Sequence, residues 1–300
     1  MSPVSALKQG FSMAMRARPA VWVLLLVNLG LAALAGWPIY RGILRFTGHS
    51  LMSQKLAYDL SYDWLTDFAV NSPGSLDRYA ALIALVGLIS IPINAVLAGG
   101  VLGRFRNPDL PFSLAAFFHD VRRYWGRLIR LMILGLVAYW LVFLATNRGL
   151  GRLISVYTSD WQDDQVVFLL RLAAGLLCIV GLAIVNLVVD YARVKLVMED
   201  GASAAEAILA SLGFSLGRLR NALTVYALPT LASVALLGLY WLVVPWTLIN
   251  APAEGAWAQY REPLVVALLF LGQQLVMFGR FWFRVAAWAG EWSYYGGSRQ

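Results

Sequence analysis

The stretch Val166-Val-Phe-Leu-Leu-Arg171-Leu-Ala-Ala-Gly-Leu-Leu-Cys178-Ile-Val-Gly-Leu-Ala-Ile-Val-Asn186-Leu-Val-Val189 decides the fold. It has 24 residues and only one charged side chain, Arg171, close to its start. A helix of about 20 apolar residues crosses the roughly 30 Å hydrocarbon core of a membrane. The stretch therefore predicts a membrane-spanning helix, with the Arg171 side chain reaching back to the membrane interface.

The rest of the chain repeats this pattern. Hydrophobic residues make up 60% of it and charged residues 13%, against roughly 45–50% and about 25% in an average soluble domain. The apolar blocks are residues 19–40, 79–103, 131–147, 166–189, 221–250 and 263–283. We therefore expect an all-α polytopic bundle of about six transmembrane helices, forming a single domain over residues 1–300. Residues 79–147 and 166–250 follow the same order of motifs, which indicates either a parallel repeat or chance similarity between membrane segments.

The positions of Lys and Arg predict the orientation, because segments rich in these residues stay in the cytoplasm. With the N-terminus inside, the basic segments between Arg104 and Arg130 and between Arg193 and Arg220 are also inside, while most acidic residues lie outside. We expect a multi-pass protein of the bacterial cytoplasmic membrane with both termini inside. Ala33-Leu-Ala35 also matches a signal-peptidase site, and cleavage there would leave five helices in the same orientation.

Two segments on the predicted cytoplasmic side have amphipathic character. From Ser113 to Leu128 apolar residues share one helical face and basic residues another, and Ser203-Ala-Ala-Glu206 is typical of a capping box at a helix start. We expect two interfacial helices here, in contact with lipid head groups. The candidate interfacial or partner-binding residues are Arg104, Arg122, Arg123, Arg127 and Glu206. Helices that only pack on the bundle are the alternative.

Polar residues gather at the predicted cytoplasmic ends of the spans. Asn186, Asp190 and Arg193 are four and three residues apart, so they share one helical face. An Asp190–Arg193 ion pair there would either pin the helix end to its neighbours or line a gate or substrate path.

Other intramembrane residues have simpler interpretations. Arg280 and Arg284 lie four apart and would meet anionic lipid or Asp190. Ala95, Gly99 and Gly103 form a ridge of small residues suited to close helix packing. Amides in the first two spans, Asn28 and Asn94, are expected to form interhelical hydrogen bonds.

The sequence gives little support to an enzyme. It has no HExxH, CxxC, P-loop or dinucleotide motif, and its single cysteine, Cys178, lies inside an apolar block. Gly213-Phe-Ser215-Leu-Gly217 matches the hydrolase pattern G-x-S-x-G, but that motif requires a preceding strand. We expect no catalytic residue, no metal and no cofactor. The net charge of +8 comes from Lys and Arg beside apolar blocks, so we expect lipid head groups rather than nucleic acid as its partner.

One group of proteins has a related pattern. Asp190-Tyr-Ala-Arg193, Glu199-Asp200, Ser203, Ala207 and the basic residue Arg218 resemble a motif of bacterial six-helix membrane proteins. These proteins are similar to the membrane domain of glycerophosphodiester phosphodiesterases and to Yip-like proteins. The resemblance covers about residues 95–230 and implies a helical bundle without the phosphodiesterase activity. The sequence thus favours a non-enzymatic scaffold or partner subunit that binds a membrane protein or a second copy of itself, with a transporter of a small or lipid-like solute as the alternative.

Overall fold

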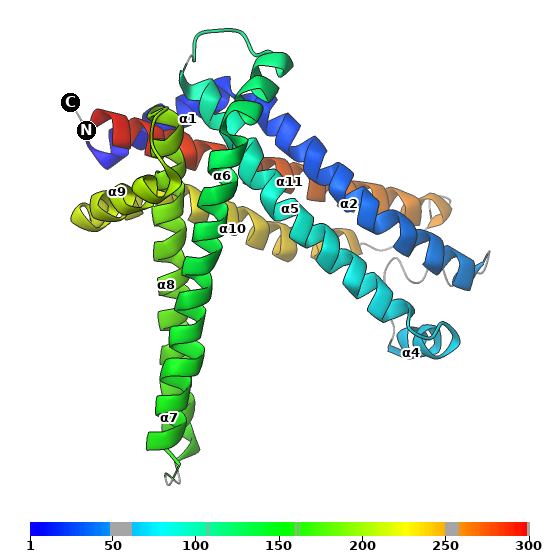
Figure 1. Ribbon diagram of the computed structural model, residues 1–300. Helices are drawn as coiled ribbons and strands as arrows, with labels where there is room; N and C mark the ends of the chain where they lie inside the picture. Colours follow the sequence, from blue (N-terminus) through cyan, green and yellow to red (C-terminus); the bar gives the residue numbers. More distant parts are fainter. Residues whose placement is uncertain (49–61, 107, 160, 162, 250–257, 299–300) are drawn as a thin grey trace. The chain divides into compact units, whose positions relative to one another are not determined.

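The computed structural model describes residues 1–48, 62–106, 108–159, 161, 163–249 and 258–298 (Figure 1). This part of the chain is almost entirely helical and contains no strand, which confirms the all-α prediction. The helices are α1 (Pro3–Arg16), α2 (Arg18–Thr47), α4 (Tyr62–Asn71), α5 (Ser75–Arg106), α6 (Leu114–Phe143), the π-helix η1 (Leu144–Leu150), α7 (Gly151–Tyr157), α8 (Asp164–Met198), α9 (Ala204–Gly217), α10 (Leu219–Ile249) and α11 (Ala258–Gly297).

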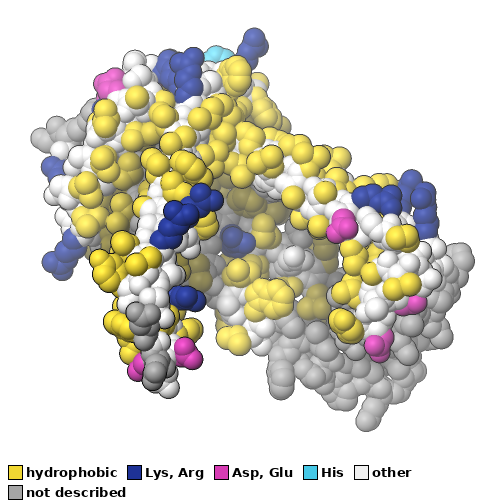
Figure 2. Space-filling view, turned by 60° about the horizontal axis from the view of Figure 1, so that its bottom comes forward, with side chains coloured by type: hydrophobic (Ala, Val, Ile, Leu, Met, Phe, Trp, Pro, Cys, Tyr) yellow, Lys and Arg dark blue, Asp and Glu magenta, His cyan; other side chains and the backbone are white. Residues whose placement is uncertain are grey.

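Five of the described helical segments are long and apolar enough to cross a membrane. They are Arg18–Thr47, Ser75–Arg106, Leu114–Tyr157, Asp164–Met198 and Leu219–Leu242. Hydrophobic side chains cover most of the surface visible in Figure 2, with charged groups scattered among them, as expected for a chain surrounded by lipid. The predicted sixth span, 263–283, falls within α11, part of whose side chains lie outside the described residues. The count of six spans stays a prediction.

The helix starts follow local sequence. Asp163 caps α8 by accepting hydrogen bonds from the backbone amides of Gln165 and Val166, at 3.0 and 3.3 Å. Ser203 caps α9 in the predicted way, accepting from the Glu206 amide at 3.2 Å. Ser113 precedes α6 but its side chain makes no capping hydrogen bond.

The two predicted amphipathic helices differ in the structure. The second is a separate helix, α9. The first is not separate from the following span, because residues 114–143 form the single helix α6. Only Gly126 interrupts the good helix formers between these parts, and one glycine costs a helix about 1 kcal/mol.

The chain divides into two compact units. Unit 1 contains Met1–Ala17, Ala95–Leu228 and Ala286–Gln300, and unit 2 contains Arg18–Asn94 and Pro229–Val285. In unit 2, Asn28 and Asn94 exchange amide hydrogen bonds at 2.9 Å in both directions, as expected from the sequence. Whether residues 1–300 act as one domain, and whether they contain a repeat, stay predictions.

Unit 1 has a dense core near the chain termini. In α8 almost every residue from Leu187 to Val197 is buried, whereas most of Phe168–Val180 at the other end of the helix is exposed and apolar. α8 packs against both α6 and α9. Further buried residues come from α1, α5, α6 and α11: Ala6, Ala14, Val101, Leu102, Tyr124, Leu128, Ala286 and Ala289. This core holds the polar residues at the end of α8.

Candidate functional site

The Asp190–Arg193 pair lies in the core of unit 1. Asp190 is 1% exposed, and its Oδ1 accepts a hydrogen bond from Arg193 Nη1 at 2.6 Å. The indole Nε1 of Trp288, on α11, donates to the same oxygen at 3.5 Å. The pair therefore joins α8 to α11 in a site without water access to the carboxylate.

Asn186 lies one turn before Asp190 but bonds different helices. Its side-chain oxygen accepts from the Tyr139 hydroxyl of α6 at 2.8 Å, and its amide nitrogen donates to the Tyr226 hydroxyl of α10. The predicted polar face of α8 thus contacts three neighbouring helices. These contacts are those of a helix end fixed by its neighbours.

A second buried carboxylate lies on α11. Glu291 is fully buried, one turn after Trp288, and Tyr191 beside Asp190 is also fully buried. Aromatic rings surround this region: Phe214 of α9 contacts Tyr191 and Tyr295, with ring centroids 5.4 and 5.0 Å apart. The end of α8, α9 and the end of α11 are therefore held together by aromatic packing around ionisable groups.

A third polar cluster surrounds Asp200, in the turn between α8 and α9. Its carboxylate contacts Arg106 Nη1 and Arg123 Nη2, both at 2.8 Å, and accepts from the Tyr124 hydroxyl at 2.9 Å. Arg127 donates to the Asp200 backbone carbonyl. Partial burial opposes ionisation of this carboxyl, but the hydrogen bonds from Arg106 and Tyr124 and the nearby positive charges outweigh it, so the pKa of Asp200 is lowered.

Of the residues predicted to bind a partner or lipid, some contact turns of unit 1 and others are exposed. Arg123 and Arg127 bind the Asp200 turn, and Arg104 donates to the carbonyls of Pro108 and Leu110. Arg122 and Glu206 are exposed. Most of this basic set therefore closes the turns of unit 1 and does not project outward.

The remaining predicted residues lie away from these clusters, in the small-residue ridge of α5 and in the unit 2 part of α11. Ala95 is buried, and a Cβ added at Gly99 would lie 2.8 Å from Leu128 Cδ1 of α6. A Cβ at Gly103 would lie 2.7 Å from Asp120 Cβ, so this ridge packs closely against α6. In unit 2, Arg280 is exposed, with Nη1 3.8 Å from Met277 Sδ, and Arg284 is half-buried.

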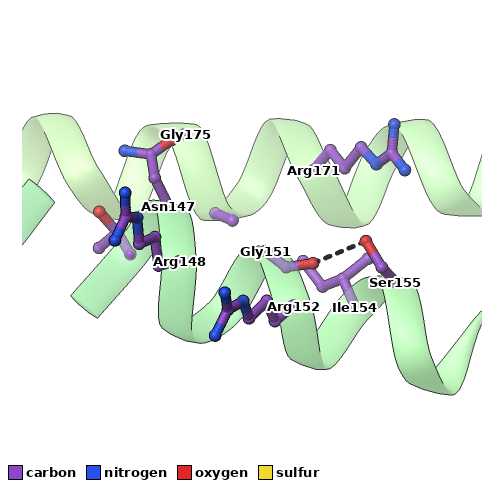
Figure 3. A pocket seen from close by; sticks show the side chains of 10 residues that line it. Asn147, Arg148, Gly151, Arg152, Ile154, Ser155, Arg171 and Gly175 are labelled. Carbon is purple, nitrogen blue, oxygen red and sulfur yellow. Dashed lines mark hydrogen bonds between the residues drawn. The ribbon is translucent and has the colours of Figure 1, made fainter. Parts of the chain in front are cut away.

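A cavity lies at the other end of the α6–α8 hairpin (Figure 3). Its volume is about 470 Å³, and its lining residues are Thr146, Asn147, Arg148, Gly151, Arg152, Ile154, Ser155, Arg171, Ala174 and Gly175. Arg148 and Arg152 come from η1 and α7, and Arg171 comes from α8 on the opposite side. The Ser155 hydroxyl donates to the Gly151 carbonyl at 2.9 Å. The cavity is lined by three arginines together with polar and apolar groups.

No family model, curated protein or solved structure matches this chain.

Two features of these sites were missed by sequence reasoning. Glu291 follows the predicted end of the last span at residue 283, in an aromatic segment to which no role was assigned. The apolar residues from Val285 to Tyr295, with one acidic residue among them, were the available signal. Arg171 was expected to reach the membrane interface and Arg148 and Arg152 were assigned no site, because no sequence pattern shows that the three share a cavity.

Proposed function

We propose that this chain is a non-enzymatic component of a bacterial cytoplasmic membrane that binds a partner membrane protein through α9. The observation that carries the proposal is the division of α9 into two faces. Its buried face consists of small residues: Ala204, Ala207, Ser211 and Ser215. Its exposed face carries Leu209, Leu212 and Leu216, which are 69%, 38% and 53% exposed.

The spacing of the exposed face indicates its occupant. Ala205, Leu209, Leu212 and Leu216 are separated by four, three and four residues, the spacing of an a/d seam between two packed helices. Glu206 is the only ionisable residue of α9, and Arg218 and Arg220 follow its end. A partner helix with its own apolar seam and charges matched to these ends would cover the stripe, which supports a partner protein as the ligand.

The core beside α9 favours this role over transport. A transporter with Asp190 on its substrate path needs water or solute to reach that carboxylate. Asp190 is 1% exposed and bonded to Arg193 and Trp288. A dry, paired Asp190 supports a rigid platform for α9.

Photo-crosslinking from α9 tests the proposal. In a Cys178→Ser background, cysteines replacing Leu209, Leu212 or Leu216 are labelled with a benzophenone maleimide and irradiated in native membranes. We expect one discrete protein adduct, the same from all three positions, identified by mass spectrometry as another membrane protein or a second copy of this chain.

Glu206→Cys and Gly213→Cys serve as matched controls, because both positions are exposed on α9 outside the leucine stripe. They should give little of the adduct. Crosslinks to lipid alone from the stripe, or equal adducts from stripe and control positions, would show that α9 only lies in the membrane interface and would contradict the proposal.

A further inference from the structure

We propose that the cavity between η1, α7 and α8 binds a phosphate group, carried either by a phospholipid or by a soluble anion. This site is independent of the proposed role of α9, which lies at the opposite end of α8.

Three arginines line the cavity and no acidic residue does, within the described residues. Arg148 and Arg152 lie one turn apart on one side of the hairpin, and Arg171 lies on the other. None of the three makes an ion pair with a described residue. Arginine stays protonated at all physiological pH values, so three positive charges line the cavity. All three residues are exposed, and Figure 3 shows their guanidinium groups pointing in different directions, so a bound anion would have to draw them together.

The chemistry of the lining suits phosphate. Guanidinium groups bind phosphate through two parallel hydrogen bonds. The Thr146 and Ser155 hydroxyls already donate to the backbone carbonyls of Val142 and Gly151, so the arginines would supply the main donors to the anion. Gly151 and Gly175 leave room on the two sides. A volume of about 470 Å³ falls within the range of roughly 300–1,000 Å³ typical of small-ligand sites.

The position of Arg171 explains why the site lies beside the membrane. Arg171 is seven residues after the first residue of α8, which places it about 10 Å along the helix axis. A lipid-facing arginine is costly there unless its charge is compensated. Arg148 lies in the π-helix η1 on the opposite side of the hairpin, and π-turns are frequent at functional sites.

The test uses purified full-length protein in a phosphate-free detergent. In one arm phosphatidylglycerol is added, with diacylglycerol as the matched lipid that lacks a phosphate, and bound lipid is counted by native mass spectrometry. In the other arm inorganic phosphate or pyrophosphate is titrated and the melting temperature is followed. Binding of phosphatidylglycerol alone identifies a lipid ligand, and stabilisation by the inorganic anions alone identifies a soluble one.

Substitutions place the binding in the cavity. Arg171→Gln and Arg148→Gln should each weaken binding about tenfold, as expected for loss of about 1.4 kcal/mol. Arg171→Lys should fall between these variants and the wild type, because it keeps the charge but loses the bidentate contact. Arg45→Gln is the control, since Arg45 is an exposed arginine of α2 that does not line the cavity.

Three results would overturn the proposal. They are no binding of either probe, equal binding of phosphatidylglycerol and diacylglycerol without any effect of inorganic anions, and an Arg171→Gln variant that binds as well as Arg45→Gln. Melting temperatures of the variants without ligand show that each is folded.

Discussion

Asp190 and Asp200 lie ten residues apart, yet their charges are stabilised by different means. Asp190 is almost completely buried and relies on one guanidinium and one indole. Removing one partner from such a pair is costly because the other charge stays buried. The Asp200 side chain is 36% exposed and contacts Arg106 and Arg123. Solvent screens this second cluster, so its contribution to stability is smaller.

The Asp200 cluster makes stability depend on pH. The folded-state pKa of Asp200 lies below its unfolded value, which is near 4. The stabilisation is therefore complete above about pH 4 and is lost as the pH falls through the folded-state pKa. We expect Asp200→Asn to lower the melting temperature by roughly 2–4 °C at neutral pH, corresponding to about 1 kcal/mol.

Melting curves of the wild type and Asp200→Asn between about pH 7 and pH 3 check this expectation. The difference between the two proteins should shrink at the acidic end, because the wild-type carboxyl becomes protonated. A difference that stays constant over the whole range would mean that the Asp200 charge does not stabilise unit 1.

At the scale of the elements, helix contacts in unit 1 depend on residues without large side chains. α1 approaches the end of α11 so closely that a Cβ added at Gly10 would lie 2.7 Å from the Gly290 Cα. α5 approaches α6 through Gly99 and Gly103 in a similar way. Small residues at helix contacts allow backbones to approach and pack in membrane proteins. The buried face of α9 uses alanine and serine for the same purpose.

The contact between α1 and α11 predicts the effect of one methyl group. Gly10→Ala should destabilise the protein by about 1–3 kcal/mol, the usual cost of overpacking, because the neighbouring atoms belong to the backbone of α11 and cannot rotate away. Gly30→Ala is the matched control, since no atom lies within 4 Å of its added Cβ. That change should leave stability equal or slightly higher, as alanine favours helices. Unfolding in detergent measures both, and equal stability of the two variants would show that α1 is not tightly packed.

The elements were easier to predict than the sites. Long apolar blocks predicted the helices because a membrane-spanning helix needs about 20 consecutive apolar residues, which can be seen directly in the sequence. The break between α6 and its predicted surface segment was wrong because a change from basic to apolar residues does not interrupt a helix backbone. The cavity could not be predicted, since Arg148 and Arg171 line the same cavity only because two helices are paired. Glu291 was missed because the predicted span ended at residue 283, and the aromatic residues after it do not by themselves show that the helix continues into a buried core.

For the whole molecule, the positions of the termini bear on topology. α1 and the end of α11 belong to unit 1 and lie beside each other (Figure 1), and Ser293 Oγ lies 3.5 Å from Met13 Sδ. Two ends on one side of a membrane require an even number of crossings. Five apolar segments are found among the described residues, so the predicted topology with both ends inside requires α11 as a sixth crossing.

Cysteine labelling tests this topology. In a Cys178→Ser background, we expect a membrane-impermeant maleimide to label Ser159→Cys in intact cells, because Ser159 lies at the turn of the α6–α8 hairpin. Ser2→Cys and Ser298→Cys should react only after the cells are permeabilised. Labelling of one terminus but not the other in intact cells would require an odd number of crossings and contradict the prediction.

The π-helix η1 also bears on which insertions and deletions the protein can tolerate during evolution. Each residue turns an α-helix by about 100°, so the gain or loss of one residue between Arg148, in η1, and Arg152, in α7, would rotate one side chain relative to the other about the helix axis. A single codon inserted there would rearrange the lining of the cavity without replacing any of its residues. Chain length at this one turn, and not only amino-acid identity, is what natural selection would have to maintain.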